Sequence, residues 1–219
     1  MKTIVCFGDS NTWGYMPKKE EPFVTAANRF PWDIQWPGVL QEKLGPAYRI
    51  VEEGLNGRTT AFECPMEENR SGLQEIGICL EIQTPVDLVI IMLGTNDTKF
   101  TINLPPYVIA HGIDRLIRKI KGAGFGPDGA DPEILIAAPP HLGETIEETW
   151  SCTEFDRTSV AKDRELADYY KEAAARAGVH FVDTGALITA DPADCVHMNE
   201  EGHARMADLM YGEIKSILG

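Results

Sequence analysis

Five short runs of β-branched and other apolar residues recur along the 219-residue chain, and they constrain its fold more than any other feature. The runs are Thr3–Phe7, Arg49–Glu53, Asp87–Leu93, Glu133–Ala137 and His180–Asp183. Helix-patterned segments separate them, and this alternation is typical of a parallel sheet with helices on both faces. The sequence therefore predicts an α/β fold, a three-layer α/β/α sandwich with a flavodoxin-like five-stranded parallel sheet.

The segments between these runs carry apolar residues at helical spacing. The clearest stripe consists of Ile109, Ile113, Leu116, Ile117 and Ile120, which fall on one face of a helix. Further helices are predicted from Pro37 to Leu44, from about Asp163 to Ala177, and after Asn199, a favoured N-cap residue.

Two segments, Met16–Gln35 and Ala138–Arg157, show no regular period. Each follows a predicted strand, so we expect both at the carboxyl edge of the sheet, where folds of this class bind ligands. The first, continued to the next residue, is rich in aromatic side chains: Phe23, Phe30, Trp32 and Trp36. These aromatics could pack on the protein itself, shape a substrate pocket or form a subunit contact.

Composition excludes several classes of protein. The chain is 43% hydrophobic and 25% charged, as expected of one globular domain over residues 1–219. No apolar run is long enough for a membrane span, and the net charge of −14 argues against binding nucleic acid or an anionic membrane. The five cysteines form no CxxC pair, which favours neither a disulfide framework nor a zinc site. Because a strand-like run follows Met1 where a secretory signal would have its apolar core, we expect a cytoplasmic protein.

Short polar motifs follow the first three predicted strands, and a fourth precedes the last helix. They are Gly8-Asp9-Ser10, Gly54-Leu55-Asn56-Gly57, Gly94-Thr95-Asn96-Asp97 and Asp194-Cys195-Val196-His197. Loops at the carboxyl ends of parallel strands converge on one rim of the sheet. The four motifs are therefore expected to form one site.

These residue types suit acyl transfer through a serine. Ser10 needs a base, and His197 is the preferred candidate because Asp194, three residues before it, can orient the imidazole. The backbone N–H groups of Ser10 and Gly57 and the side-chain amide of Asn96 can stabilise an oxyanion. Asp9 is assigned a structural role, hydrogen-bonding local backbone.

The four motifs resemble, in order, the four blocks of the SGNH hydrolase superfamily, also called GDSL-type esterases. The strings FGDSNTWG (7–14), EEGLNGRTT (52–60) and DLVIIMLGTNDT (87–98) are similar to one branch of it, the bacterial arylesterases and short-chain acyl-ester hydrolases with acyltransferase activity. Asn11 departs from the family pattern, which has leucine there. The resemblance implies that the aromatic segment borders the active site and helps to build a homo-oligomer.

Other residues compete for roles at the site. Asp191 is a less favoured orienter than Asp194, and His203 is expected to be a surface or packing residue of the last helix. We expect Trp13, His141 and Val196 to contact substrate, although a non-catalytic surface role for His141 is an equal alternative.

The sequence thus predicts a serine esterase for small ester substrates, with short acyl or aryl groups, that needs no metal or cofactor. Acyl transfer to alcohols and deacetylation of carbohydrates remain open as alternatives on the same site. A non-catalytic binding module is a rival from another class, since a fold does not fix function. Dinucleotide binding is disfavoured, because the loop Gly8–Gly14 lacks the GxGxxG spacing.

Overall fold

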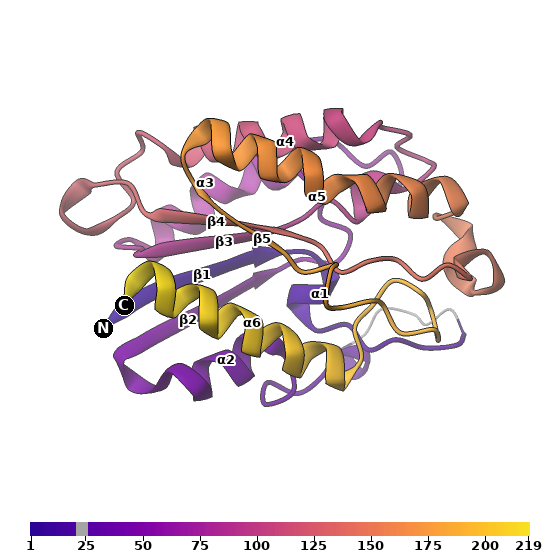
Figure 1. Cartoon of the computed structure of the whole chain (residues 1–219), viewed down its shortest axis with the longest axis horizontal. Helices are drawn as coiled ribbons and strands as arrows, with labels where there is room; N and C mark the ends of the chain where they lie inside the picture. The colour runs from indigo at the N-terminus through magenta and orange to yellow at the C-terminus, as the bar shows by residue number, and fades with distance from the viewer. Residues whose placement is uncertain (21–25) are drawn as a thin grey trace.

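The computed structural model describes residues 1–20 and 26–219 and confirms the predicted α/β/α sandwich (Figure 1). Its five strands are β1 (Lys2–Gly8), β2 (Tyr48–Gly54), β3 (Leu88–Met92), β4 (Glu133–Ala138) and β5 (His180–Asp183). All neighbouring pairs are parallel, and the strand order is β2-β1-β3-β4-β5. The five predicted runs therefore correspond to the five strands.

The register of β1 with its two neighbours brings three strand ends to the same level. Gly8, the last residue of β1, pairs with Gly54 of β2 on one side and with Met92 of β3 on the other. The loops that follow these three strands consequently begin side by side at one edge of the sheet.

Helices cover both faces of the sheet (Figure 1). On one face lie α3 (Gly72–Gln83), α4 (Pro106–Ile120) and α5 (Arg157–Ala177), and on the other lie α2 (Trp36–Leu44) and α6 (Glu200–Leu218). Successive residues of β1 point to opposite layers, as strand geometry requires: Val5 and Phe7 join the first core and Ile4 and Cys6 the second.

Two of the differences from the predicted helices concern α5 and α3. α5 begins at Arg157, earlier than the predicted start near Asp163, because Asp156 caps it and forms a capping box with Ser159. α3 was not predicted. Its apolar residues do not form a single stripe, since Ile78 and Ile82 are 63% and 72% exposed on the side away from the core.

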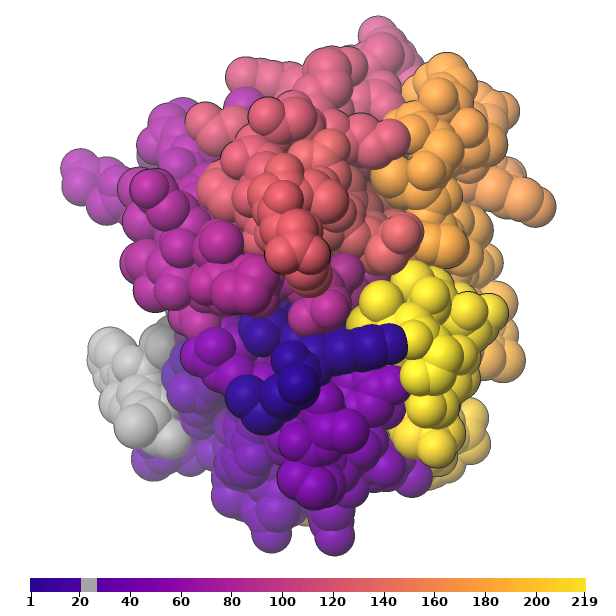
Figure 2. Space-filling model, turned by 90° about the vertical axis from the view of Figure 1, so that its left-hand side faces the viewer, coloured from indigo at the N-terminus to yellow at the C-terminus, as the bar shows by residue number. Residues whose placement is uncertain are grey.

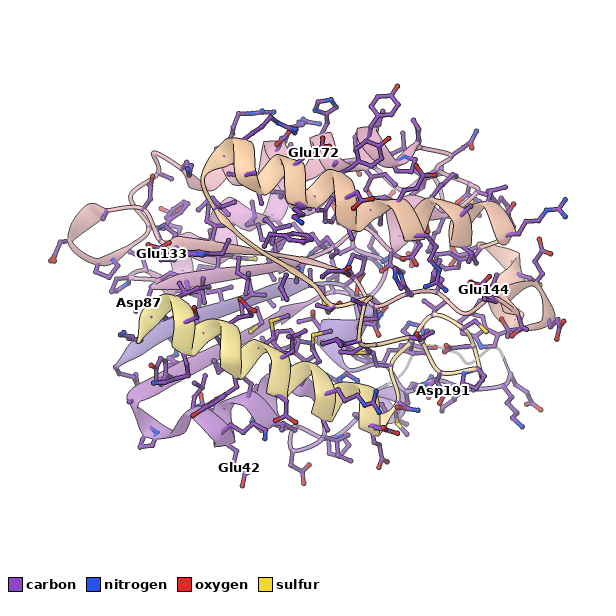
Figure 3. All side chains as sticks on the ribbon, viewed as in Figure 1. Glu42, Asp87, Glu133, Glu144, Glu172 and Asp191 are labelled. Carbon is purple, nitrogen blue, oxygen red and sulfur yellow. The ribbon has the colours of Figure 1, made fainter. Side chains whose placement is uncertain are left out.

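The two ends of the chain lie together at the amino edge of the sheet. Figure 2 shows the indigo N-terminal residues against the yellow C-terminal helix, and the Lys2 ammonium donates a hydrogen bond to the Leu218 carbonyl. Asp87 and Glu133 lie toward this end and Asp191 toward the opposite, carboxyl end (Figure 3). No helix within residues 1–20 and 26–219 has the length and apolar character needed to cross a membrane.

A buried carboxylate joins the loops that follow β2 and β3. These loops are not neighbours in the sheet, because β1 lies between their strands. Asp97, after β3, accepts hydrogen bonds from the Thr60 backbone N–H (2.9 Å) and from the Thr60 hydroxyl (2.6 Å). Both residues are fully buried, and burial raises the pKa of Asp97 to about 7 although the Thr60 hydrogen bonds lower it.

This carboxylate should make the stability of the fold depend on pH. Its ordinary pKa is 3.8, so between that value and about 7 the folded chain binds more protons than the unfolded chain. The contribution of Asp97 to the free energy of unfolding therefore falls as the pH rises through this window. Asp97→Asn cannot ionise, so the wild-type value minus the variant value, from urea denaturation, should decline between about pH 5 and about pH 8.

Asp168→Asn, which alters an exposed carboxylate of α5, is the matched control and is measured at the same two pH values. If the free energy of unfolding of wild type minus that of Asp97→Asn stays constant or grows with pH, the raised pKa of Asp97 is contradicted.

Candidate active site

Ser10 is placed by a short helix at the carboxyl end of β1. The helix, α1 (Ser10–Trp13), begins immediately after Asp9, whose carboxylate accepts a hydrogen bond from the Asn11 N–H at 3.0 Å. This is the structural role predicted for Asp9. As the first residue of α1, Ser10 has no partner within the helix for its backbone N–H, which is therefore available to a ligand.

His197 lies beside Ser10 and is oriented by Asp194. The distance from His197 Nε2 to Ser10 Oγ is 3.0 Å, and that from His197 Nδ1 to Asp194 Oδ2 is 2.7 Å. The other oxygen of Asp194 accepts hydrogen bonds of 2.9 Å from the backbone N–H groups of Val196 and His197. All three side chains of the Ser10–His197–Asp194 array are buried.

Asp191, the alternative orienter, does not contact His197 through its carboxylate and instead binds groups of its own loop. One oxygen accepts a hydrogen bond from the Ala193 N–H and the other accepts one from the Asn199 side-chain amide, both at 2.8 Å. His203, the alternative base, is fully buried in α6, where its Nδ1 accepts a hydrogen bond of 3.3 Å from the Trp36 N–H. Burial lowers the pKa of His203 to about 4, and of the two predicted roles, surface or packing, the structure shows packing.

The predicted oxyanion donors lie on the loops after β2 and β3, and they border the same cavity as Ser10. Asn96 donates one N–H of its side-chain amide to the Arg58 carbonyl at 3.1 Å, which leaves the second N–H for a ligand. Gly57 has φ of +76°, and a Cβ on it would lie 2.4 Å from a carboxylate oxygen of Glu67. The positive φ favours glycine here, whereas the Glu67 side chain could move away from a Cβ.

A cavity of about 420 Å³ opens over these groups. Its apolar walls come from Tyr15, Met66, Trp150, Phe155 and Val196, and its charged lining from Glu67, Lys99 and Glu154. The structure thus places Val196 where a substrate-contacting residue was expected. Lys99 and Glu154 form an ion pair of 2.8 Å in which the lysine is almost completely buried.

Trp13 does not line this cavity, contrary to expectation. α1 ends at Trp13, and Gly14 follows with φ of +88°, which reverses the chain. The Trp13 ring consequently lies against the Arg29 guanidinium, 4.8 Å from the ring centroid, and Tyr15 takes its place in the wall. The Tyr15 ring stacks on the His197 imidazole with a centroid distance of 4.2 Å and an interplanar angle of 28°.

His141 also lies outside the cavity. Its Nδ1 is 2.9 Å from a carboxylate oxygen of Asp163 on α5, and its backbone pairs with the segment around Thr189. The Asp163 carboxylate is buried, so a partner on the adjacent segment stabilises it. This contact turns His141 toward α5, and the structure supports the non-catalytic alternative.

The aromatic residues of the irregular segment mostly pack on the protein itself. Trp36 is fully buried in the α2–α6 layer, and Phe30 contacts His203 edge-on with a centroid distance of 5.3 Å. Trp32 is 43% exposed. Phe23 lies outside the described residues.

Sequence reasoning missed Arg58, which joins three elements around the oxyanion donors. Its guanidinium donates to the carbonyls of Gly8 and Glu53, at the ends of β1 and β2, and forms an ion pair of 2.8 Å with Glu75 on α3. Its own carbonyl accepts from Asn96. The arginine is strongly buried. Its position directly after Gly57 was the one signal in the sequence that could have indicated a role at the site.

No group of three or more His, Cys, Asp or Glu side chains among the described residues is arranged to hold a metal ion. The site consists of a serine hydroxyl, an oriented imidazole and converging N–H donors. Together these can deprotonate the hydroxyl for attack on a carbonyl and stabilise the negative charge that develops on the carbonyl oxygen.

Comparison with known proteins agrees with this geometry. The model of the GDSL-like lipase/acylhydrolase family matches residues 6–205. Among solved structures, the native aryl esterase of M. smegmatis is 32% identical, with 100% of both chains covered and a TM-score of 0.89. Est24, a carbohydrate acetylesterase from Sinorhizobium meliloti, is 33% identical, again with 100% of both chains covered, and has a TM-score of 0.88. Comparison with curated proteins returns no significant match.

The family match spans nearly the whole chain and includes all four motifs. The solved relatives share the fold over their full length. The resemblance inferred from the motifs is therefore confirmed, and the chain belongs to the GDSL-like lipase/acylhydrolase family, whose members are carboxylic ester hydrolases.

Proposed function

We propose that this protein hydrolyses small carboxylic esters through an acyl-enzyme on Ser10. The proposal rests mainly on the 3.0 Å contact between Ser10 Oγ and His197 Nε2, since an imidazole at hydrogen-bond distance can accept the hydroxyl proton. Asp194, on the opposite side of the imidazole, fixes the tautomer with the proton on Nδ1 and stabilises the imidazolium.

In the first half of the reaction, Ser10 Oγ attacks the ester carbonyl carbon while its proton passes to His197 Nε2. The oxygen of the tetrahedral intermediate is held by the N–H groups of Ser10, Gly57 and Asn96. When the intermediate collapses, the C–O bond to the alcohol breaks and His197 returns the proton to the departing oxygen.

In the second half, water attacks the acyl-enzyme and gives a proton to His197. Collapse of the second intermediate breaks the bond to Ser10 Oγ, which regains a proton from the imidazole as the acid is released. An alcohol in place of water would give acyl transfer by the same steps.

Replacing the nucleophile tests this scheme directly. Ser10→Ala removes the attacking oxygen and should abolish hydrolysis of p-nitrophenyl acetate, with circular dichroism and the unfolding temperature close to wild type. A fluorophosphonate should label wild type at Ser10 and leave the variant unlabelled. Hydrolysis by Ser10→Ala at the wild-type rate would refute the mechanism, and an unlabelled, inactive wild type would favour a binding module.

The oxyanion donors can be tested through Asn96. Asn96→Asp keeps the side-chain shape but replaces the N–H donors with acceptor oxygens, and Asn96→Ala removes them. Each should lower kcat by about 10²–10³ with a much smaller change in KM, because the contact forms in the transition state. A kcat within twofold of wild type for both variants would exclude Asn96 from the oxyanion hole.

The cavity supports short-acyl or aryl esters as substrates, with sugar acetates as the second candidate. Its volume of about 420 Å³ suits a small ester, and Tyr15, Trp150 and Phe155 give its wall an aromatic character that suits an aryl or sugar ring. The two named relatives, an aryl esterase and a carbohydrate acetylesterase, correspond to these two alternatives.

A substrate series distinguishes these alternatives. With p-nitrophenyl esters of increasing acyl length, kcat/KM should fall steeply beyond short chains, because the cavity walls limit the acyl group. Phenyl acetate and acetylated xylose and glucose, assayed alongside, identify the preferred alcohol. Adding a short alcohol as acceptor and measuring the ratio of new ester to acid measures acyl transfer. Preference for long acyl chains would contradict the proposed substrate class.

A further inference from the structure

The side chain of Asn11 connects the nucleophile's helix to the loop that carries His197. Its Nδ2 donates a hydrogen bond of 3.2 Å to the Val196 carbonyl, and its Oδ1 accepts one of 2.9 Å from the Met198 N–H. These two backbone groups belong to the residues immediately before and after His197. A single side chain therefore holds the backbone on both sides of the imidazole.

The chemistry of this contact requires an amide. A carboxamide presents a donor and an acceptor in one plane, as a backbone peptide group does, so it can pair with a carbonyl and an N–H at once. Asn11, Val196 and Met198 are all buried, with exposed fractions of 1%, 5% and 0%. Without the amide, the Val196 carbonyl and the Met198 N–H would lose these partners in a place that water barely reaches.

The position is also the one at which this chain departs from the leucine of the family pattern. A leucine has a similar volume but neither donor nor acceptor, and so cannot make either contact. The attachment between α1 and the His197 loop therefore depends on having asparagine at this position.

Asn11 complements the contacts on the other side of the histidine. Asp194 fixes the His197 loop through its two backbone hydrogen bonds and its contact with Nδ1, but it belongs to the same loop. It therefore cannot set the position of the loop relative to Ser10. Asn11 can, because it is the residue next to Ser10 in α1.

We propose that Asn11 is a positioning residue that sets the separation between Ser10 Oγ and His197 Nε2. The inference depends on the proposed function, in which that contact carries the proton transfer. Loss of the tether allows the loop to shift relative to α1, and a displacement of about 1 Å between reacting groups can lower a rate roughly 10²-fold.

The principal test is Asn11→Leu, assayed with p-nitrophenyl acetate and with a fluorophosphonate. We expect kcat to fall roughly 10- to 100-fold with KM within about twofold of wild type. The rate of fluorophosphonate labelling should fall by a similar factor, because that reaction also requires His197 to take the Ser10 proton.

Ile214→Val, in the buried part of α6 near the amino edge of the sheet, is the control for lost stability alone. It should lower the unfolding temperature without changing kcat or labelling at 25 °C. Asn11→Ala is the second variant, and the space it leaves can admit a water molecule, which restores part of the hydrogen bonding and favours folding. Its kcat should lie between those of wild type and Asn11→Leu.

A folded Asn11→Leu or Asn11→Ala variant with wild-type kcat and labelling rate would overturn the proposal. In the wild-type protein, the Met198 amide should be among the slowest to exchange with deuterium, and rapid exchange would overturn the proposal even if neither variant folds. An inactive, unlabelled wild type would instead refute the proposed function, so the two failures are distinguishable.

Discussion

The arrangement of the site depends on the hydrogen-bonded alignment of β1 with β2 and β3. Because Gly8 pairs with both Gly54 and Met92, the loops after three strands start at one level. This alignment brings Ser10, Gly57 and Asn96 to one cavity although they are far apart in the sequence. Regular parallel pairing thus brings together the proposed nucleophile and the proposed oxyanion donors, and the cross-links through Arg58 and Asp97 stabilise their spacing.

His197, the proposed general base, reaches the site in another way. Its loop follows β5, and β3 and β4 lie between β5 and β1 in the sheet. The chain must therefore cross two strand ends before His197 meets Ser10. The α2–α6 layer fixes the start of α6, which follows the His197 loop, because the Trp36 N–H donates a hydrogen bond to His203 Nδ1. Side-chain contacts then join the His197 loop to α1: Asn11 hydrogen-bonds the backbone on both sides of His197, whose Nε2 lies 3.0 Å from Ser10 Oγ.

Two buried carboxyls, Asp9 and Asp97, and the buried guanidinium of Arg58 lie close to the site. Burial raises the pKa of Asp9 to about 6 and that of Asp97 to about 7, so these carboxyls beside the proposed oxyanion donors bind a proton more readily than exposed aspartates do. The positive charge of Arg58 acts in the opposite direction on Asp9, lowering its pKa. A neutral carboxyl or a compensated carboxylate opposes the developing negative charge less than an uncompensated carboxylate would. Arg58, which follows Gly57 in the chain, therefore has an electrostatic role as well as a structural one.

Sequence patterns predicted the strands and the main helices because burial on both faces and helical periodicity leave clear signals. They failed for α3, whose exposed Ile78 and Ile82 obscure the stripe, and for Trp13 and Tyr15, whose directions depend on the left-handed turn at Gly14. The partners of Asn11 and Arg58 could not be predicted, since both side chains bind backbone groups that have no signature in the sequence.

The walls of the cavity come mainly from loops and from the short 3-10 helix Trp150–Thr153. Trp150 donates a hydrogen bond of 2.8 Å from its indole N–H to the Lys18 carbonyl, which joins the two irregular segments, and Lys99 braces the second through Glu154. The reacting groups, in contrast, are fixed by strand ends and buried hydrogen bonds. Substitutions of cavity-lining side chains in these segments can therefore change the ester that fits, as long as Thr149 and Ser151 keep their hydrogen bonds to the Asp194 carbonyl. This separation gives a physical reason why an aryl esterase and a carbohydrate acetylesterase can share one fold with this chain at nearly equal identity.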